Sequence, residues 1–300
     1  MSDSIAITSG KGGVGKTTFA VNLSIAQKKF TDQVFLLDTD MGMANSHVLL
    51  GVNPEYSISD VISGEKQISE IIENYKMGIN LISGGTASNN LLNLENVKRY
   101  SILNEIDNHL KTFKNVKLMV DIAAGAEDNA LVFSLACDRI LIVIVGEPTS
   151  FIDSYALIKA LHSKSSFKNY CVAVNQVDND SHGKDLFKKF QSITAKFLDV
   201  NLHYVGCVKS SQKIRKSIVD RKPISISEPK SEISQSFLKI AKNINETPSN
   251  EWGGLTFLSK VGNALVPVVI TSITICANIC ILVLAADSPA VAVGTCATAV

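Results

Sequence analysis

A glycine-rich loop near the start of the chain has the residue types that bind the phosphate groups of a nucleotide. It reads Gly-Lys-Gly-Gly-Val-Gly-Lys-Thr-Thr over residues 10–18 and lies between an apolar run and an apolar helical stretch. In this context glycines let backbone N–H groups converge on phosphate oxygens, and the helix N-terminus adds positive potential. Lys16 would offset the charge of the β- and γ-phosphates, and the Thr17 hydroxyl would coordinate Mg²⁺ directly. The predicted phosphate-binding residues are Gly10, Lys11, Gly12, Gly13, Val14, Gly15, Lys16, Thr17 and Thr18.

Acidic side chains follow two further apolar runs. Asp38 and Asp40 come after one such run, and Asp121 closes the run Leu-Met-Val-Asp at residues 118–121. A carboxylate delivered by a strand to the edge beside a phosphate loop suits a contact with Mg²⁺ through water, because Mg²⁺ keeps several of its waters. We therefore expect Asp38 and Asp121 to contact Mg²⁺ in this way. The alternative, an aspartate that merely ends a strand, is weakened by the presence of the phosphate loop.

The elements that must position these residues alternate along the chain between short β-branched runs and helical stretches. This alternation is typical of a parallel sheet wrapped by helices, whose ligands bind where the strands end. The expected strands are Ile5–Ser9, Val34–Asp38, Ile79–Ser83, Leu118–Asp121, Arg139–Val145, Cys171–Asn175 and Leu202–Val205. The expected helices are Lys16–Lys29, Glu95–Lys111, Asp128–Cys137, Ser150–His162, Lys184–Leu198, Ser211–Asp220 and Ser231–Asn243. The predicted fold class is an α/β P-loop NTPase, with a mostly parallel sheet of seven or eight strands and helices on both faces.

The composition argues against several classes of function. The 29 basic and 28 acidic residues leave a net charge of +1, which provides no general attraction for nucleic acid, so no specific nucleic-acid partner is predicted. The six cysteines include no C-x-x-C pair and no Cys/His cluster, and no secretory signal precedes the first apolar run. This pattern favours free thiols in a reducing cytosol.

The end of the chain differs from the rest. After Lys260 the last 40 residues carry one charge, Asp287, and residues 264–286 are 23 residues without any. That length suffices to span a bilayer, and the apolar residues of 255–265 recur at helical spacing. We divide the chain into a P-loop domain at 1–244, a linker at 245–254 and a membrane-associating tail at 255–300. The alternatives for the tail are a β-branched segment that joins a protein interface and an extension produced by a frameshift.

Lys11 places a second lysine inside the phosphate loop, and the loop resembles the deviant Walker A motif of the MinD/ParA ATPases. The resemblance implies ATP and Mg²⁺ as ligands and a homodimer that sandwiches two ATP molecules. It further implies that Lys11 reaches the partner's phosphates and acts with Lys16 in catalysis, whereas a solvated loop lysine is the alternative. Asp121 looks like the Walker B aspartate of this family. Asp38 and Asp40 match its switch residues, Asp40 being the one that orients the attacking water.

Asn175 and Lys209 stand where the family forms the pocket for the base of the nucleotide. Asn175 ends a predicted strand at a position where the family commonly contacts adenine, and an Asn that forms a turn is the alternative. The next strand reads Gly-Cys-Val-Lys at 206–209, where related proteins usually have a proline at the position of Lys209. We therefore expect the geometry of the base pocket, but not that of the phosphate site, to differ from the family.

Three stretches are similar to the flagellar-number regulators, the FlhG/FleN branch of the family. They are residues 37–45, 121–128 and 147–159, within a resemblance that runs from about residue 4 to residue 244. The resemblance implies a cytoplasmic ATPase that dimerises with ATP on the inner face of the membrane and regulates flagellar number. The implied partners are a flagellar SRP-type GTPase (FlhF-like) or switch-complex proteins.

Other members of the family remain alternatives to this interpretation. A MinD-type division-site ATPase shares the core and a membrane-binding C-terminus, and a scaffold that binds ATP without hydrolysis is also compatible with the motifs. A partition ATPase would need a basic DNA-binding patch, and iron–sulfur relatives would need paired cysteine ligands. Metabolic kinase-like members stay open, because a fold does not determine a function.

Overall fold

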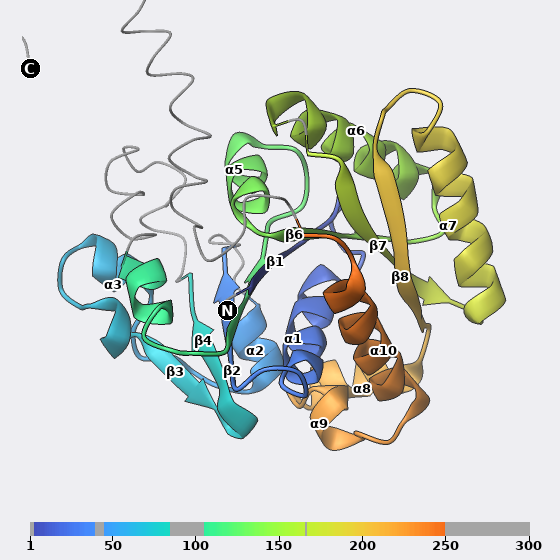
Figure 1. The fold of residues 1–300 in the computed structure, drawn as a ribbon. Helices are drawn as coiled ribbons and strands as arrows, with labels where there is room; N and C mark the ends of the chain where they lie inside the picture. The colour runs from blue at the N-terminus through green and yellow to red at the C-terminus, as the bar shows by residue number, and fades with distance from the viewer. Residues whose placement is uncertain (1–2, 40–44, 85–104, 166, 250–300) are drawn as a thin grey trace, which may run out of the picture.

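A single sheet with helices on both faces forms the described part of the chain (Figure 1). The computed structural model describes residues 3–39, 45–84, 105–165 and 167–249. Within them the sheet has eight strands in the order β3-β4-β2-β5-β1-β6-β7-β8, and every neighbouring pair is parallel except β3 with β4. The predicted fold class is confirmed. The strands are β1 (Asp3–Thr8), β2 (Gln33–Asp38), β3 (Ile72–Tyr75), β4 (Ile79–Ile82), β5 (Val116–Asp121), β6 (Arg139–Ile144), β7 (Asn169–Val177) and β8 (Asn201–Lys209).

The helices form two layers that bury separate hydrophobic clusters (Figure 1). One face of the sheet packs against α1 (Lys16–Gln27), α2 (Ser46–Leu50), α9 (Ile224–Ser227) and α10 (Glu232–Glu246). The other packs against α3 (Ile58–Ile62), a helical stretch at 105–110, α5 (Asp128–Ala136), α6 (Pro148–Ser165) and α7 (Asp180–Thr194). The remaining elements are α8 (Gln212–Val219) and the 3₁₀ turns η1 (Ile68–Glu70) and η2 (Lys76–Gly78).

The sequences of the central elements explain their places. The middle of β5 and all of β6 after its first residue are apolar because both faces of these strands are covered, as is usual for strands of a parallel sheet. The helix α10 instead buries one stripe, which includes Ile233, Phe237, Ile240 and Ile244 at spacings of three and four residues. Phe237 meets Phe19 of α1 edge-on, with ring centroids 5.2 Å apart. This packing fixes α1, and with it the loop that precedes it.

Several elements differ from the sequence prediction. β3 was not predicted, because its sequence Ile-Glu-Asn-Tyr is polar and the strand lies at the edge of the sheet. The short helices α2, α3 and α9 were also not predicted. α7 begins at Asp180, four residues before its predicted start, because the Asn179 side chain accepts a hydrogen bond from the His182 N–H and caps the helix. Of the helix predicted at 95–111, residues 95–104 lie outside the described residues.

The end of the last described helix can be compared with the predicted boundary between the domain and the tail. α10 continues to Glu246, so the first two residues of the predicted linker are helical, while the division of the chain at residue 244 stays a prediction. The tail at 255–300, with the apolar stretch 264–286, lies outside the described residues. No helix within the described ranges is both long and apolar enough to cross a membrane.

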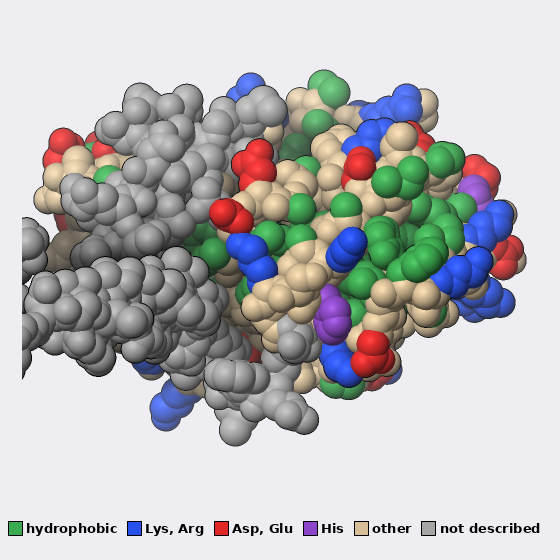
Figure 2. All heavy atoms as spheres, turned by 90° about the horizontal axis from the view of Figure 1, so that it is seen from above, with side chains coloured by type: hydrophobic (Ala, Val, Ile, Leu, Met, Phe, Trp, Pro, Cys, Tyr) green, Lys and Arg blue, Asp and Glu red, His purple; other side chains and the backbone are tan. Residues whose placement is uncertain are grey.

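Figure 2 shows hydrophobic side chains gathered on the outer face of α6 and α7, where Ile152 is 65% exposed.

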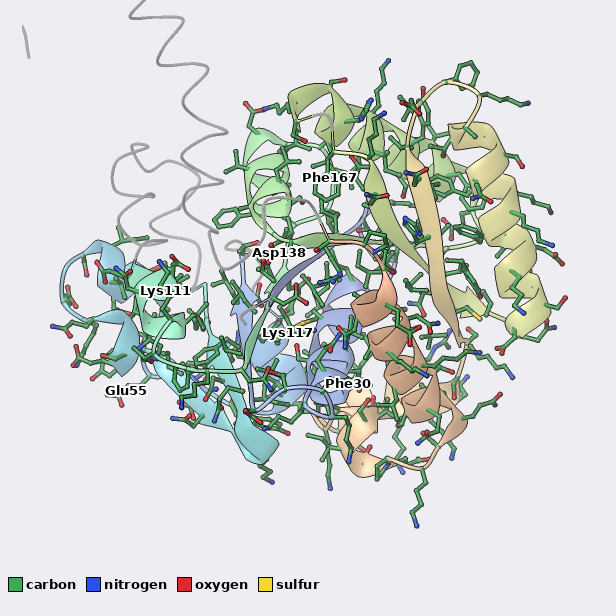
Figure 3. All side chains as sticks on the ribbon, in the orientation of Figure 1. Phe30, Glu55, Lys111, Lys117, Asp138 and Phe167 are labelled. Atoms are coloured by element: carbon green, nitrogen blue, oxygen red, sulfur yellow. The ribbon has the colours of Figure 1, made fainter. Side chains whose placement is uncertain are left out.

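The parallel strands all begin at one side of the sheet and all end at the opposite side. Phe30, Lys117, Asp138 and Phe167, labelled in Figure 3, all lie where strands begin or just before them. The phosphate loop, Asp38, Asp121 and Asn175 lie where strands end. We call these the amino edge and the carboxyl edge.

Candidate nucleotide-binding site

The loop between β1 and α1 has a backbone that only glycine permits at two points. A Cβ atom on Gly10 would lie 2.1 Å from the carbonyl carbon of Asp153, so the loop approaches the backbone of α6 closely. Gly15 adopts the left-handed conformation with φ of 89° and is the N-cap of α1. It has no side chain to cap the helix, and the first turn carries no acidic residue. The first N–H groups of α1 therefore form an anion-binding end at the carboxyl edge.

Lys16 and Asp121 meet beside this helix end. The Lys16 Nζ lies 3.5 Å from an oxygen of Asp121, and both side chains are buried. The Thr17 hydroxyl lies close to the Asp121 carboxylate and acts to lower its pKa. Complete burial raises the pKa of Asp121 to about 7; Asp38 adds to the rise, and Lys16 opposes it. In the chain without a ligand, Lys16 thus offsets only part of the cost of burying a negative charge on Asp121.

The carboxylates of Asp38 and Asp121 lie side by side, because β2 and β5 pair in a register that places these residues opposite each other. Asp38 is buried and accepts a hydrogen bond from the Ser46 N–H at 2.9 Å. Thr39 fixes the end of β5, since its N–H and its hydroxyl both donate to the Asp121 carbonyl oxygen. Sequence reasoning missed Thr39 and Ser46. Their nearness to Asp38 was the available signal.

Lys11 makes its contacts within its own chain. Its Nζ lies 2.6 Å from the Glu147 carboxylate and 3.1 Å from the Thr149 hydroxyl. The ion pair is open to solvent, with 38% of the Lys11 side chain and 58% of the Glu147 side chain exposed. Sequence reasoning did not assign Glu147 or Thr149 to the site, although both follow β6 at the carboxyl edge.

Asn175 borders a cleft that begins at the phosphate loop and continues between β8, α8 and α10. The cleft is lined by residues that include Gly15, Asn175, Gln176, Lys209, Arg215 and Phe237. The Asn175 side-chain amide donates a hydrogen bond to the Val14 carbonyl oxygen at 2.7 Å. Lys209, which stands where relatives usually have a proline, forms an ion pair with Glu232 at the first turn of α10. A contact between Asn175 and adenine stays a prediction.

The predicted residues fit a magnesium–nucleotide complex in their arrangement. The N-terminus of α1 and Lys16 would hold the phosphates, and the Thr17 hydroxyl, Asp121 and Asp38 are brought together where Mg²⁺ would lie. Asp40, the predicted water-orienting residue, lies outside the described residues, so its role stays a prediction.

A parallel sheet whose first strand leads through a glycine loop into a helix, with a buried lysine and an aspartate from a neighbouring strand, defines a P-loop NTPase. The sequence model of the ParA family, described as "NUBPL iron-transfer P-loop NTPase", matches residues 1–245. The chain belongs to the ParA family.

Relatives and a solved structure agree with this membership. The antiactivator FleN of Pseudomonas aeruginosa is 33% identical over 258 residues, which cover 84% of this chain and 90% of FleN. The flagellum site-determining protein YlxH of Helicobacter pylori is 30% identical over 238 residues, which cover 79% of this chain and 80% of YlxH. The septum site-determining protein MinD of Pyrococcus horikoshii, solved in complex with Mg-ADP, is 22% identical and covers 82% of this chain and 97% of its own, with a TM-score of 0.66. This last likeness concerns the fold.

Proposed function

We propose that this chain is a Mg²⁺-dependent ATPase that works as a nucleotide-controlled dimer switch. The observation that carries the proposal is the phosphate loop, with Lys16 and Thr17 beside the buried Asp121. Hydrolysis of ATP requires that a water be held in line with the γ-phosphate and that the developing charge be stabilised. Bound Mg²⁺ would supply part of that charge stabilisation. Lys16 stabilises the phosphates, and Asp40 orients the water.

The switch depends on where Lys11 is held. In the single chain Lys11 is paired with Glu147 and Thr149, so it must leave both before it can reach the phosphates of a second chain. A dimer that sandwiches two ATP molecules gives Lys11 new partners of higher negative charge. ATP thus binds the dimer better than the monomer, which is the differential affinity that a ligand-controlled switch needs.

The biochemical test compares the full-length chain with its Asp40→Ala variant. The wild-type chain is expected to hydrolyse ATP and the variant to bind ATP without turnover, accumulating as a dimer in sedimentation with ATP and Mg²⁺. Equal hydrolysis by both would remove Asp40 from the mechanism. Absence of turnover in the wild-type chain, with ATP still bound, would favour a scaffold that binds ATP without hydrolysis.

We further propose a role in setting flagellar number or placement, which the names of the FleN and YlxH relatives support. A MinD-type role in placing the division site is the second candidate, supported by the similarity in sequence to septum site-determining MinD proteins. The partners under the first proposal are a flagellar SRP-type GTPase or switch-complex proteins. Deleting the gene distinguishes the two roles: cells with extra flagella support the first, and minicells support the second.

The proposed location is the inner face of the cell membrane, reached through residues 255–300. The support is the uncharged stretch 264–286, and the doubling of tails in a dimer would raise the affinity for the membrane through avidity. Fractionation tests the mode of attachment. Release of the full chain from membranes by carbonate or high salt would exclude a segment that spans the bilayer, whereas its retention would support one.

A further inference from the structure

The contact between Asn175 and Val14 joins the end of β7 to the middle of the phosphate loop. The bond is 2.7 Å long and links residues 161 positions apart, and Asn175 is 7% exposed. Its direction is determined by chemistry, because only the amide nitrogen of Asn175 can donate to a carbonyl oxygen. The structure thus shows a buried side chain whose donor is used by the loop itself.

This bond constrains one peptide group of the loop. The peptide between Val14 and Gly15 is trans and planar, so its C=O and its N–H point in opposite directions. Holding the Val14 carbonyl toward Asn175 therefore turns the Gly15 N–H away from Asn175. Gly15 is free to adopt either sign of φ, so without a partner this peptide could rotate and reverse both groups.

The surroundings of Asn175 keep it in this position. A Cβ atom on Gly15 would lie 2.5 Å from the Asn175 amide nitrogen, so any other residue at this place in the loop would displace the amide. The register of β7 with β8 shifts between Asn175 and Val177, and Gln176 between them has a left-handed φ of 58°. A left-handed conformation is unfavourable for glutamine, and a bulge of this kind redirects a side chain at the end of a strand.

We propose that Asn175 is a positioning residue for the phosphate loop: it holds the Val14–Gly15 peptide so that the Gly15 N–H faces the phosphates. The inference rests on the proposed function, since it concerns how the same site binds its ligand. It differs from the predicted contact with adenine in one measurable respect. A residue that acts through the loop affects every phosphate ligand equally, whereas a residue that contacts adenine affects only ligands that carry adenine.

The experiment measures the affinity of the full chain for Mg²⁺ with ADP, with GDP and with inorganic tripolyphosphate, by titration calorimetry. Asn175→Ala is expected to weaken all three by a similar factor of roughly 3 to 10, the loss of one neutral hydrogen bond. Asn175→Ser keeps a hydroxyl donor and is expected to lose less for all three. Asn169→Ala removes the same residue type at the opposite end of β7 and is expected to change none of the affinities.

The outcomes separate this inference from the function on which it rests. If Asn175→Ala weakens ADP but leaves tripolyphosphate unchanged, Asn175 contacts the base and the inference is wrong. It is also wrong if no affinity changes. Should the alanine variant fail to fold, Asn175→Ser decides through the same ratio of ADP to tripolyphosphate affinity, which a general loss of stability does not alter. A wild-type chain that binds none of the three ligands would overturn the proposed function, and this inference with it.

Discussion

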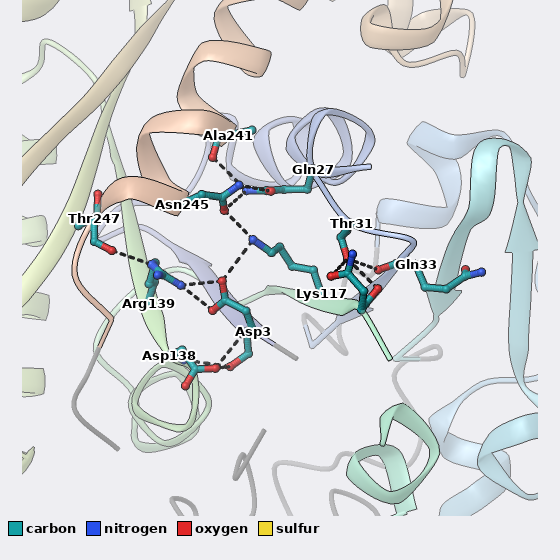
Figure 4. Close-up of polar contacts among 12 residues, drawn as sticks. Asp3, Gln27, Thr31, Gln33, Lys117, Asp138, Arg139, Ala241, Asn245 and Thr247 are labelled. Carbon is teal, nitrogen blue, oxygen red and sulfur yellow. Dashed lines mark hydrogen bonds and ion pairs between the residues drawn. The ribbon is translucent and has the colours of Figure 1, made fainter. Parts of the chain in front are cut away.

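The two edges of the sheet treat buried charge in opposite ways. At the carboxyl edge Asp38 and Asp121 lie side by side, and the Lys16 Nζ comes no closer to Asp121 than 3.5 Å. At the amino edge Asp3 lies within 2.6 Å of Arg139 and 3.2 Å of Lys117 (Figure 4). The same sheet therefore carries one cluster of closely paired charges and another in which two buried carboxylates lie next to each other with Lys16 at a longer distance.

The amino-edge cluster is built around the end of α10. Asn245 accepts a hydrogen bond from the Lys117 Nζ at 2.6 Å and exchanges hydrogen bonds with Gln27 at the end of α1. Arg139 donates through Nε to the Thr247 carbonyl oxygen at 3.0 Å, and its Nη1 donates to both oxygens of Asp3. A buried ion pair repays its desolvation where further hydrogen bonds satisfy the charges, as they do here, so this cluster serves the fold. At the carboxyl edge the buried ion pair is longer, with the Lys16 Nζ 3.5 Å from Asp121, and we expect this edge to bind the nucleotide.

The largest effect is expected from Lys16→Ala at the carboxyl edge. Removal of this charge should lower ATP hydrolysis by about 10³-fold, the cost of losing one preorganised group that stabilises the transferring phosphoryl. The free energy of unfolding of the nucleotide-free chain should change little, because the contact of Lys16 with Asp121 is long. Turnover assays and thermal unfolding measure the two quantities. A collapse of stability that matched the loss of activity would mean that Lys16 mainly serves the fold, and the contrast between the edges would be lost.

The next effect concerns the pH dependence of stability. The folded chain holds a proton on Asp121 up to a pKa of about 7, whereas the unfolded chain releases it near 4. Between these values the folded state binds more protons, so stability should fall as the pH rises, at a slope of up to about 1.4 kcal/mol per pH unit. Asp121→Asn should remove this fall. Denaturant titrations of both chains from pH 4 to 8, without nucleotide or Mg²⁺, measure it; parallel curves would show that Asp121 is ionised in the folded chain throughout.

The sequence predicts the carboxyl edge better than the amino edge for a physical reason. A glycine loop is a local pattern, and carboxylates at the ends of apolar runs can be assigned to one edge because parallel strands end together. Contacts between side chains on different strands cannot be predicted in the same way, because they depend on the order of the strands in the sheet. The contacts of Lys11 with Glu147 and of Asn175 with Val14 join residues 136 and 161 positions apart, and neither was predicted.

The amino-edge cluster was not predicted at all. Asp3, Lys117 and Arg139 stand at the beginnings of strands, where charged residues are ordinarily solvated. Here the last turn of α10 covers them, and its length was underestimated because Asn245 and Glu246 were assigned to a linker. β3 was missed for the converse reason: its polar residues suit an exposed edge strand and give no apolar signal.

Lys117→Met tests the amino edge. The Lys117 side chain is 8% exposed, and burial lowers its pKa while Asp3 opposes the shift. Loss of its charge leaves Asp3 with Arg139 alone and the Asn245 oxygen without one of its donors, which should cost about 2 to 3 kcal/mol of unfolding free energy. Affinity for ADP should not change. Lys242→Met, which removes an exposed pair with Glu246 on the same helix, is the matched control and should cost less than about 0.5 kcal/mol. Equal losses from the two variants would mean that the buried cluster contributes no more than a surface pair.

The smallest effect is expected from Glu147→Gln, which removes the exposed partner of Lys11. An ion pair this open to solvent contributes less than about 1 kcal/mol, so unfolding of the single chain should hardly change. Lys11 no longer has to give up a carboxylate before it reaches a second chain, so the protein concentration at which ATP produces half dimer should fall. Because each of the two chains gives up one such contact, the fall should be roughly 2- to 25-fold. Sedimentation of the full-length chain with ATP and Mg²⁺, against the wild type, measures this. A weaker dimer in the variant would show instead that Glu147 also holds the Lys11 of the partner.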